Sequence, residues 1–420
     1  MKRITLLLLA LTILFPLWRG VGGGILYSQW IVRPSGTTDL LYGLSFANIS
    51  TGMACGEAGR IWKTTNGGYS WILLTTTASY WLASIHMIDP STAVTVGYPQ
   101  KILKTTNGGT VWSSYGGSAY INYYSVSFKD ANTGLISGYV GTLLRSTNGG
   151  VSWAQVPGFP QVSMEEVKFV TPNKAFVLGY YGFMRMSVDG GANWTSVNTN
   201  TTADLFGVSF ADDNIGYAVG SGGTIIKTED GGFTWFQQTS GTVFGLESVS
   251  FANANTGNVC GWGSTILRTT DGGASWNQQS SPVGNTTLET IVMNSAMNGV
   301  IVGGGGLILY TTTGGDPIGI KPISSEIPAD YSLEQNYPNP FNPATKIRFS
   351  IPPLEGARGR TISFIVYDAL GREVTTLVNE SLKPGTYEVD WNATNLTSGV
   401  YFYRLVADGF TESKKMLLIK

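Results

Sequence analysis

A short motif recurs along the chain at a constant interval. Six segments share a Gly-Gly pair, two variable residues and a tryptophan: TTNGGYSW, TTNGGTVW, STNGGVSW, SVDGGANW, TEDGGFTW and TTDGGASW. Successive tryptophans lie 41 residues apart, and they are Trp71, Trp112, Trp153, Trp194, Trp235 and Trp276. A period of about 40–45 residues with several short strands is typical of β-propellers, in which each repeat forms one blade.

Two further positions repeat in the same register. A marker glycine recurs at Gly56, Gly97, Gly138, Gly179, Gly220, Gly261 and, one residue late, Gly303. An apolar position recurs at Phe46, Met87, Phe128, Phe169, Phe210, Phe251 and Met293. Runs such as GVSFADD, GYAVG and GTIIKT predict three strands before each Gly-Gly turn, and no apolar rhythm of 3.6 residues predicts a helix. We therefore expect an all-β fold.

The two ends of the repeat array indicate how the ring closes. The seventh repeat stops at DPIG, and Ile318 stands where a tryptophan is due. Trp30 lies 41 residues before Trp71 but has no Gly-Gly turn in front of it. An N-terminal strand that completes the last blade would remove both free sheet edges. The sequence thus predicts a seven-bladed propeller over residues 28–316, closed by its N-terminal strand.

The recurring motif resembles the Asp-box repeat of sialidases and related propellers. Its acidic or amide side chain can accept backbone N–H groups within its own turn, and these residues are Asn66, Asn107, Asn148, Asp189, Asp230 and Asp271. The Gly-Gly pair supplies positive φ, and the tryptophan packs between blades. Because Asn replaces Asp freely, we interpret the motif as structural and not catalytic. The resemblance implies that these turns lie opposite the ligand funnel.

The unit AVGSGGTIIKTEDGGFTW further resembles the single-propeller family that includes the photosystem II assembly and stability factor. The resemblance covers about residues 28–316. It implies the fold but not a specific function, since propellers serve many functions.

Residues with catalytic chemistry are few in the propeller. A sialidase-like site needs three clustered arginines, whereas the repeats contain only Arg33, Arg60, Arg145, Arg185 and Arg268. His86 is the only histidine in the chain and occupies a repeat position elsewhere held by serine, so we interpret it as a packing residue. Because the only histidine is interpreted as a packing residue, we expect neither a Ser-His-Asp triad nor a multi-histidine metal site. We expect no catalytic residue, metal or cofactor.

The two cysteines are predicted to be unbridged. Cys55 and Cys260 each precede a marker glycine, in repeats that a seven-membered ring places two blades apart. A disulfide requires Cα atoms within about 7 Å, so we expect two buried thiols.

The loops expected at the funnel contain aromatic and acidic residues. Those before the inner strand and after the marker glycine provide Tyr42, Trp81, Tyr98, Tyr124, Tyr139, Tyr180, Phe206 and Trp262. Acidic residues among them are Glu57, Glu165, Glu166, Glu247 and Glu289. Such a rim suits sugars, or peptides with basic residues. Alternatively, several of the rings pack between blades, and the acids are solvated loop residues.

Both ends of the chain predict export. Residues 1–27 begin with Lys2 and Arg3 followed by ITLLLLALTILFPL, which is short for a membrane span and fits a signal peptide with an undefined cleavage site. We expect no transmembrane segment after signal cleavage. A linker is predicted over 317–331 and a β-sandwich over 332–420, where TYEVDW and VYFYRL alternate as half-buried strands do.

The C-terminal segment resembles the type A sorting domain of the type IX secretion system, which is related to an Ig-like domain. The resemblance is based on PNPFNP at 338–343, GREV at 371–374, SGVY at 398–401 and the lysine-rich end with Lys414, Lys415 and Lys420. It implies the type IX machinery as a partner and passage through the periplasm of a Gram-negative bacterium to the medium or the outer cell surface.

The sequence therefore predicts a secreted or cell-surface binding or scaffold propeller with a glycan or protein ligand. Two alternatives remain: a secreted glycoside hydrolase that uses funnel carboxylates, and an assembly factor for an envelope complex. A net charge of −1 gives no reason to expect nucleic acid as a partner.

Overall fold

The computed structural model describes residues 30–74, 80–99, 101–115, 121–315, 320–324, 327–353, 360–393, 396–407 and 409–420. Its contacts divide the chain into two units, one spanning Tyr27–Pro317 and the other including Ile318–Lys420. The expected signal peptide lies outside the described residues. Within those residues, no helix is long and apolar enough to cross a membrane.

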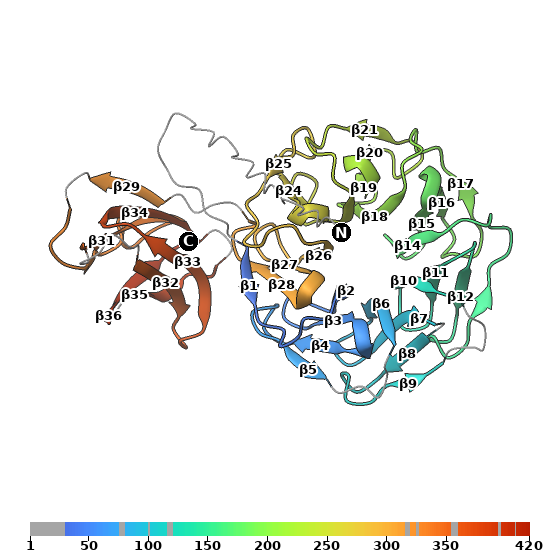
Figure 1. Ribbon diagram of the computed structural model, residues 1–420, viewed down its shortest axis with the longest axis horizontal. Helices are drawn as coiled ribbons and strands as arrows, with labels where there is room; N and C mark the ends of the chain where they lie inside the picture. Colours follow the sequence, from blue (N-terminus) through green and yellow to red (C-terminus); the bar gives the residue numbers. More distant parts are fainter. Residues whose placement is uncertain are drawn as a thin grey trace, which may run out of the picture. The chain divides into compact units, whose positions relative to one another are not determined.

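The first unit is a ring of seven four-stranded antiparallel sheets in the described part of residues 30–315 (Figure 1). In the first blade the order from the centre outward is β2 (Leu41–Phe46), β3 (Gly52–Gly56), β4 (Ile61–Thr64) and β5 (Ile72–Leu74). The innermost strands contact one another around the ring, and β26 returns to contact β2.

The other blades repeat this order. The second blade consists of β6 (Trp81–Met87), β7 (Ala93–Tyr98), β8 (Lys101–Thr105) and β9 (Ser113–Ser114), and the third of β10 (Tyr123–Phe128), β11 (Gly134–Gly138), β12 (Leu143–Ser146) and β13 (Ala154–Gln155). The fourth consists of β14 (Met164–Phe169), β15 (Ala175–Gly179), β16 (Met184–Ser187) and β17 (Thr195–Ser196), and the fifth of β18 (Leu205–Phe210), β19 (Gly216–Gly220), β20 (Thr224–Thr228) and β21 (Phe236–Gln238). The sixth consists of β22 (Leu246–Phe251), β23 (Gly257–Gly261), β24 (Ile266–Thr269) and β25 (Asn277–Gln278), and the last begins with β26 (Leu288–Met293), β27 (Gly299–Gly303) and β28 (Leu307–Thr311). In five blades a single 3₁₀ turn follows the marker glycine, at Glu57–Gly59, Tyr180–Gly182, Ser221–Gly223, Trp262–Ser264 and Gly304–Gly306.

The N-terminal strand closes the ring, as predicted. β1 (Ile31–Arg33) is the outer strand of the last blade and pairs antiparallel with β28, with Ile31 opposite Tyr310 (Figure 1). Trp30 is 1% exposed, and its indole N–H donates to Gln279 Oε1 at 2.9 Å. The last blade therefore takes its fourth strand from the other end of the propeller sequence.

Strand register separates the two faces of the ring. In the first blade Leu41 lies opposite Gly56, at the start of the inner strand, whereas Phe46 and Thr64 both lie level with Gly52 at its end. The Gly-Gly turn that follows Thr64 is therefore at the end opposite the start of the inner strand. We call the face where inner strands begin the mouth face and the other the turn face.

Side chains of the repeated motif stabilise the turns on the turn face. In the first blade Asn66 Oδ1 accepts the Ser70 backbone N–H at 2.9 Å, and the Trp71 indole donates to the Gly68 carbonyl at 2.9 Å. Asp189 makes the corresponding bonds, and hydrogen bonds from the Asn193 backbone and side chain lower the pKa of Asp189 to about 2. These contacts support the structural interpretation of the motif.

The second glycine of the turn also permits close contact between blades. Gly232 has a φ of 95°, and a Cβ atom there would lie 2.3 Å from the Phe176 ring of the preceding blade. Trp235 of the same turn packs edge-on against both Phe176 and Phe210, at ring separations of 6.1 Å. The motif thus joins a turn, a tryptophan and the neighbouring blade in one contact.

Cys55 and Cys260 are both buried and free, as predicted. The sulfur atoms lie 3.5 Å from the carbonyl oxygens of Leu82 and Leu288, each in the next blade. Burial raises the pKa of the Cys55 thiol to about 12, so it stays protonated at neutral pH.

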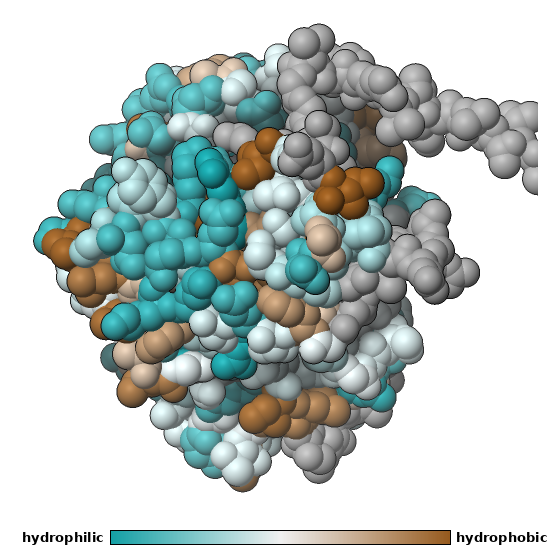
Figure 2. All heavy atoms as spheres, turned by 90° about the vertical axis from the view of Figure 1, so that its left-hand side faces the viewer, coloured by the Kyte–Doolittle hydropathy of each residue, from teal (hydrophilic) through white to brown (hydrophobic). Residues whose placement is uncertain are grey.

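The second unit is a β-sandwich of two four-stranded sheets. One has the order β29 (Ile320–Ser324), β34 (Gly385–Asn392), β31 (Ala344–Ile351), β30 (Ser332–Leu333); the other is β33 (Glu373–Leu382), β32 (Arg360–Asp368), β35 (Gly399–Ala407), β36 (Phe410–Leu418). Phe349 and Phe364, from different sheets, pack with ring centroids 5.4 Å apart in the core. The face drawn in Figure 2 carries hydrophilic and intermediate residues over most of its area, with hydrophobic residues in separate patches.

The structure differs from the predicted linker over 317–331. Ile320–Ser324 forms β29 and pairs with β34, so the C-terminal domain begins before residue 332. The segment IKPIS is too short, and too interrupted by proline, for its alternation to predict a strand.

Candidate ligand-binding channel

A central channel of about 830 Å³ is lined by the innermost strands of all seven blades. Leu41 and Leu44, on either side of two channel-facing residues, are buried in the blade. A register shift between Leu41 and Gly43 lets two consecutive residues, Tyr42 and Gly43, line the channel, as a β-bulge does. The same shift recurs in the inner strands of the other six blades, including those that carry the glutamates.

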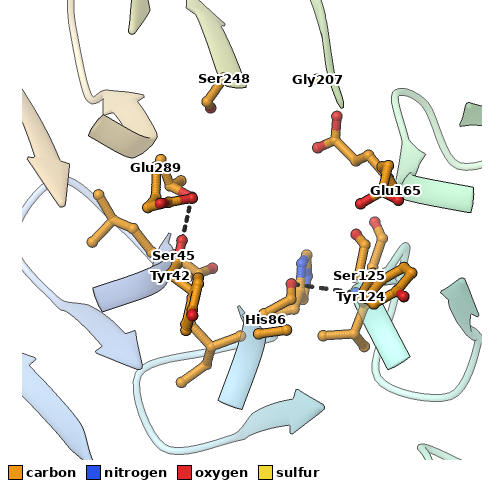
Figure 3. Close-up of a pocket in the computed structure, with 18 of the residues that line it drawn as sticks. Tyr42, Ser45, His86, Tyr124, Ser125, Glu165, Gly207, Ser248 and Glu289 are labelled. Carbon is orange, nitrogen blue, oxygen red and sulfur yellow. Dashed lines mark hydrogen bonds between the residues drawn. The ribbon is translucent and has the colours of Figure 1, made fainter. Parts of the chain in front are cut away.

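Corresponding positions of the inner strands form rings around the channel. We define the mouth ring as the position nearest the mouth face: Tyr42, Ala83, Tyr124, Glu165, Phe206, Glu247 and Glu289. The next position, which we call the second ring, contains Gly43, Ser84, Ser125, Glu166, Gly207, Ser248 and Thr290. Glu165 and Glu289 lie on opposite sides of the channel (Figure 3).

The marker glycine places a second set of residues around this mouth. The residue after it donates its N–H to the carbonyl that precedes the inner strand, as Tyr139 does to Asn122 at 3.0 Å and Trp262 to Gly245 at 2.9 Å. A Cβ atom at Gly261 would lie 2.2 Å from that same Gly245 carbonyl oxygen, so only glycine fits. The side chains after the marker glycines are thereby held at the mouth face.

Nine of the thirteen funnel residues that sequence analysis proposed line the cavity: Tyr42, Trp81, Tyr98, Tyr124, Glu165, Glu166, Phe206, Glu247 and Glu289. Three others, Tyr139, Tyr180 and Trp262, are 51%, 37% and 48% exposed outside it. The remaining residue, Glu57, accepts the Leu40 backbone N–H at 3.1 Å. Most of the proposed residues therefore line the channel, and the exposed aromatic residues form a rim around its mouth.

Burial and mutual repulsion change the titration of the mouth glutamates. Burial, followed by the charges of Glu247 and Asp204, raises the pKa of Glu165 to about 7. Burial and Glu247 raise the pKa of Glu289 to about 7 in the same way. Burial also raises the pKa of Glu247, whereas a hydrogen bond from the Trp262 indole opposes this rise.

The tyrosines at the mouth stay protonated at neutral pH. Burial and the nearby Glu57 and Glu289 raise the pKa of Tyr42 to about 12. Its ring lies 6.3 Å from that of Trp81. Burial and Glu165 raise the pKa of Tyr124 as well. The mouth thus offers carboxylates, hydroxyl donors and aromatic faces together.

Glu166 has a different role from its neighbour. Its carboxylate accepts the Val208 backbone N–H of the next blade and lies 3.6 Å from Lys168 Nζ, which itself donates to the Val208 carbonyl at 2.8 Å. Ser84 and Ser248, in the same ring, accept the corresponding N–H of their next blades. Sequence analysis did not identify Lys168 as a channel residue. Its repeat position, which Ser45, Ser127 and Ser250 hold in other blades, could have indicated this.

His86 was interpreted as a packing residue, and the structure instead places it on the channel wall (Figure 3). Its ring lies 6.0 Å from that of Phe128, and burial, helped by Lys168, lowers the pKa of His86 to about 4. The β-bulge shifts which residues of the inner strand point into the channel, and this shift places His86 on the channel side. In the described part of the chain, no group of three or more His, Cys, Asp or Glu side chains could hold a metal ion.

Comparisons with known families agree with both parts of this architecture. Residues 335–420 match the secretion system C-terminal sorting domain, and residues 186–248 and 242–336 match photosynthesis system II assembly factor YCF48. The propeller is similar to YCF48. The YCF48-like propeller and the sorting domain support a secreted or surface-exposed protein. A search of curated proteins gives no match.

Solved structures show the same fold at low sequence identity. YCF48 bound to D1 peptide is 21% identical with a TM-score of 0.60, over 69% of this chain and 99% of that chain. YCF48 from Cyanidioschyzon merolae is 19% identical with a TM-score of 0.57, over 67% and 98%. The WD40 propeller domain of Doa1 is 13% identical with a TM-score of 0.54, over 68% and 97%. These likenesses confirm the predicted fold class.

Proposed function

We propose that this protein is a non-catalytic binding propeller, exported through its C-terminal domain, that holds a glycan or protein ligand at the mouth of its central channel. The observation that carries this proposal is the mouth itself, where inner-strand carboxylates and tyrosines meet exposed aromatic rings. Trp81 is 54% exposed and Tyr98 is 48% exposed although both line the cavity. Concave sites with aromatic walls and a few polar groups are the usual form of ligand sites.

A protein ligand has support from a related propeller, because one similar structure is YCF48 bound to D1 peptide. Export has separate support from the sorting domain at residues 335–420. We further propose that the type IX secretion machinery is the partner of this domain, and that residues 1–27 are removed as a signal peptide.

Glycan and peptide arrays probed with the secreted chain test the binding function. We expect binding that falls at least tenfold in a Trp81→Ala, Tyr98→Ala double variant. Phe233→Ala is the matched control, because Phe233 is 63% exposed in a turn on the turn face. The absence of any bound ligand, or equal loss in the control, would contradict the proposal.

A second candidate is a secreted glycoside hydrolase. It is favoured by Glu165 and Glu289, since a pKa of about 7 leaves a carboxyl partly protonated at neutral pH, as a general acid requires. Release of reducing ends from a panel of polysaccharides tests it. Turnover that Glu165→Gln or Glu289→Gln abolishes would support the hydrolase over the binding protein.

A further inference from the structure

Three carboxylates at the mouth ring have no cationic partner within the described residues. Glu165, Glu247 and Glu289 come from three different blades and occupy the same register position, so all three line one cavity. The ion pairs of the described chain include none of them. The indole N–H of Trp262 donates to Glu247, which leaves its negative charge in place.

Basic groups near the channel are engaged elsewhere. Lys168 is paired with Glu166 and donates to the Val208 carbonyl. Arg60 is paired with Asp39, and Lys101 lies over the ring of Tyr80 at 4.1 Å. The mouth ring therefore has an excess of negative charge in partly buried surroundings, where a bound cation is attracted more strongly than in bulk water.

Aromatic surface continues beyond the cavity. Tyr181 is 75% exposed, Phe244 is 51% exposed and Trp262 is 48% exposed, all in mouth-face loops of the fourth and sixth blades. Aromatic faces attract cations and cover apolar side chains. A small cation fills only the centre of this surface, whereas an extended peptide also reaches the rim.

We propose that the mouth binds an extended peptide segment and receives one of its lysine or arginine side chains between Glu165, Glu247 and Glu289. This inference rests on the proposed binding function and names the ligand class. The apolar stem of the side chain packs along Tyr124 and Phe206, and its charged end reaches the carboxylates. A neutral ligand that displaced water would leave these carboxylates desolvated without a partner, which is unfavourable.

Selection from a library of random nonapeptides at pH 8, with the full chain as bait, tests this inference. We expect the enriched peptides to share a Lys or Arg at one position. In the strongest binder, acetylation of that Lys, or replacement of that Arg by citrulline, should weaken binding at least tenfold. This change leaves the protein intact, so the result does not depend on how any variant folds.

The protein side is tested with Glu165→Gln, Glu247→Gln, Glu289→Gln in one variant. It should lose at least tenfold in affinity for the selected peptide. Glu229→Gln is the control, because Glu229 pairs with Lys227 outside the cavity, and it should bind as the wild type does.

Each other outcome is informative. Enriched peptides without a basic residue, or equal binding to the triple variant, overturn the inference. Free spermidine that binds as tightly as the selected peptide overturns the peptide assignment. If no peptide is enriched but array glycans bind, the inference fails while the binding function stands; if neither binds, both fail.

Discussion

Glu165 and Glu166 are neighbours in sequence but have different surroundings in the channel. The bulge lets both side chains line the channel, yet Glu166 is bonded to Val208 and Lys168 of the wall, whereas Glu165 belongs to the mouth ring. Position in the repeat, and not residue type, therefore decides which acid is available to a ligand. The same reasoning applies to Glu247 and Glu289, which precede the wall-bound Ser248 and Thr290.

Stability should depend on pH through the mouth glutamates. A carboxyl whose pKa rises from about 4.5 to about 7 on folding is bound to a proton in the folded state when the unfolded chain has released it. The proton bound by this carboxyl therefore favours the folded state at pH 5, and this stabilisation is lost as the pH rises through 7. Glu165→Gln and Glu289→Gln should therefore raise the urea midpoint more at pH 8 than at pH 5. An equal shift of the urea midpoint at both pH values would contradict the raised pKa of these two glutamates.

Peptide binding should show the opposite dependence, because the charged carboxylates attract the ligand. Affinity should fall as the pH drops below 7 and the glutamates take up protons. The groups that face them are Asp204, Glu247, Tyr42, Tyr124, Tyr180, His86 and Lys168. The tyrosines remain protonated, and His86, with a pKa of about 4, remains neutral across this range. Calorimetric titration from pH 5.5 to 8.5 measures the effect; affinity that is constant or rises on acidification would argue against a cationic ligand.

Sequence reasoning predicted the residues of the mouth better than those of the deeper channel. The period of 41 residues, with one extra residue in the last repeat, placed Tyr42 and Glu289 at equivalent positions of the first and last blades. The bulge in each inner strand has no sequence signal, so His86 was not expected to face the channel, and Glu166 was not distinguished from Glu165. The pairing of Glu166 with Lys168 depends on Val208 of another blade, a contact that local pattern does not contain.

At the scale of the element, basic residues of the third strand hold neighbouring blades together. Lys63 Nζ donates to the Gly108 carbonyl at 2.9 Å, and Lys104 to the Gly149 carbonyl at 2.6 Å. Each acceptor is the first glycine of the next turn. Arg145 makes the same kind of bond to Gly190 at 3.2 Å. These cations of the third strand thus form contacts between neighbouring blades.

Removing one of these bonds should destabilise the ring. Lys104→Met keeps much of the aliphatic stem but loses a bond from a charged donor, so we expect the free energy of unfolding to fall by about 1–2 kcal/mol. Lys104→Arg is the matched control, since arginine serves this position in another blade. Urea denaturation of both variants measures the difference, and a silent Lys104→Met would show that the bond contributes little.

Closure by β1 should be as important as any other blade contact. Trp30 and Trp276 are 1% and 9% exposed in corresponding positions. Replacement of either by Ala should lower the free energy of unfolding by about 3–5 kcal/mol, as is usual for large-to-small core changes. If Trp30→Ala were silent in urea while Trp276→Ala were severe, β1 would not belong to the ring.

At the scale of the whole molecule, a propeller and a sorting domain are separate compact units with a boundary at Pro317 and Ile318. The end of the propeller was predicted at residue 316, whereas the start of the C-terminal domain was predicted at residue 332, 14 residues after Ile318, because β29 pairs with β34, far away in the sequence. Its pairing partner, and not its own pattern, makes Ile320–Ser324 a strand.

Deletion of residues 318–420 should leave a folded propeller that no longer reaches the cell surface. The sandwich is removed with all its strands, so no unpaired segment remains on the propeller. Cell fractionation and surface proteolysis in the native host measure the location. Unchanged arrival at the surface would contradict the sorting role but not the propeller fold.

The central claim is that the mouth face of the channel holds the ligand. Hydrogen–deuterium exchange of the full chain, with and without the tightest ligand from the arrays or the peptide library, tests it most directly. We expect slower exchange at the starts of β2, β14, β22 and β26 and in the loops after the marker glycines. The Gly-Gly turns should remain unchanged. Protection confined to those turns, or to residues 332–420, would contradict it.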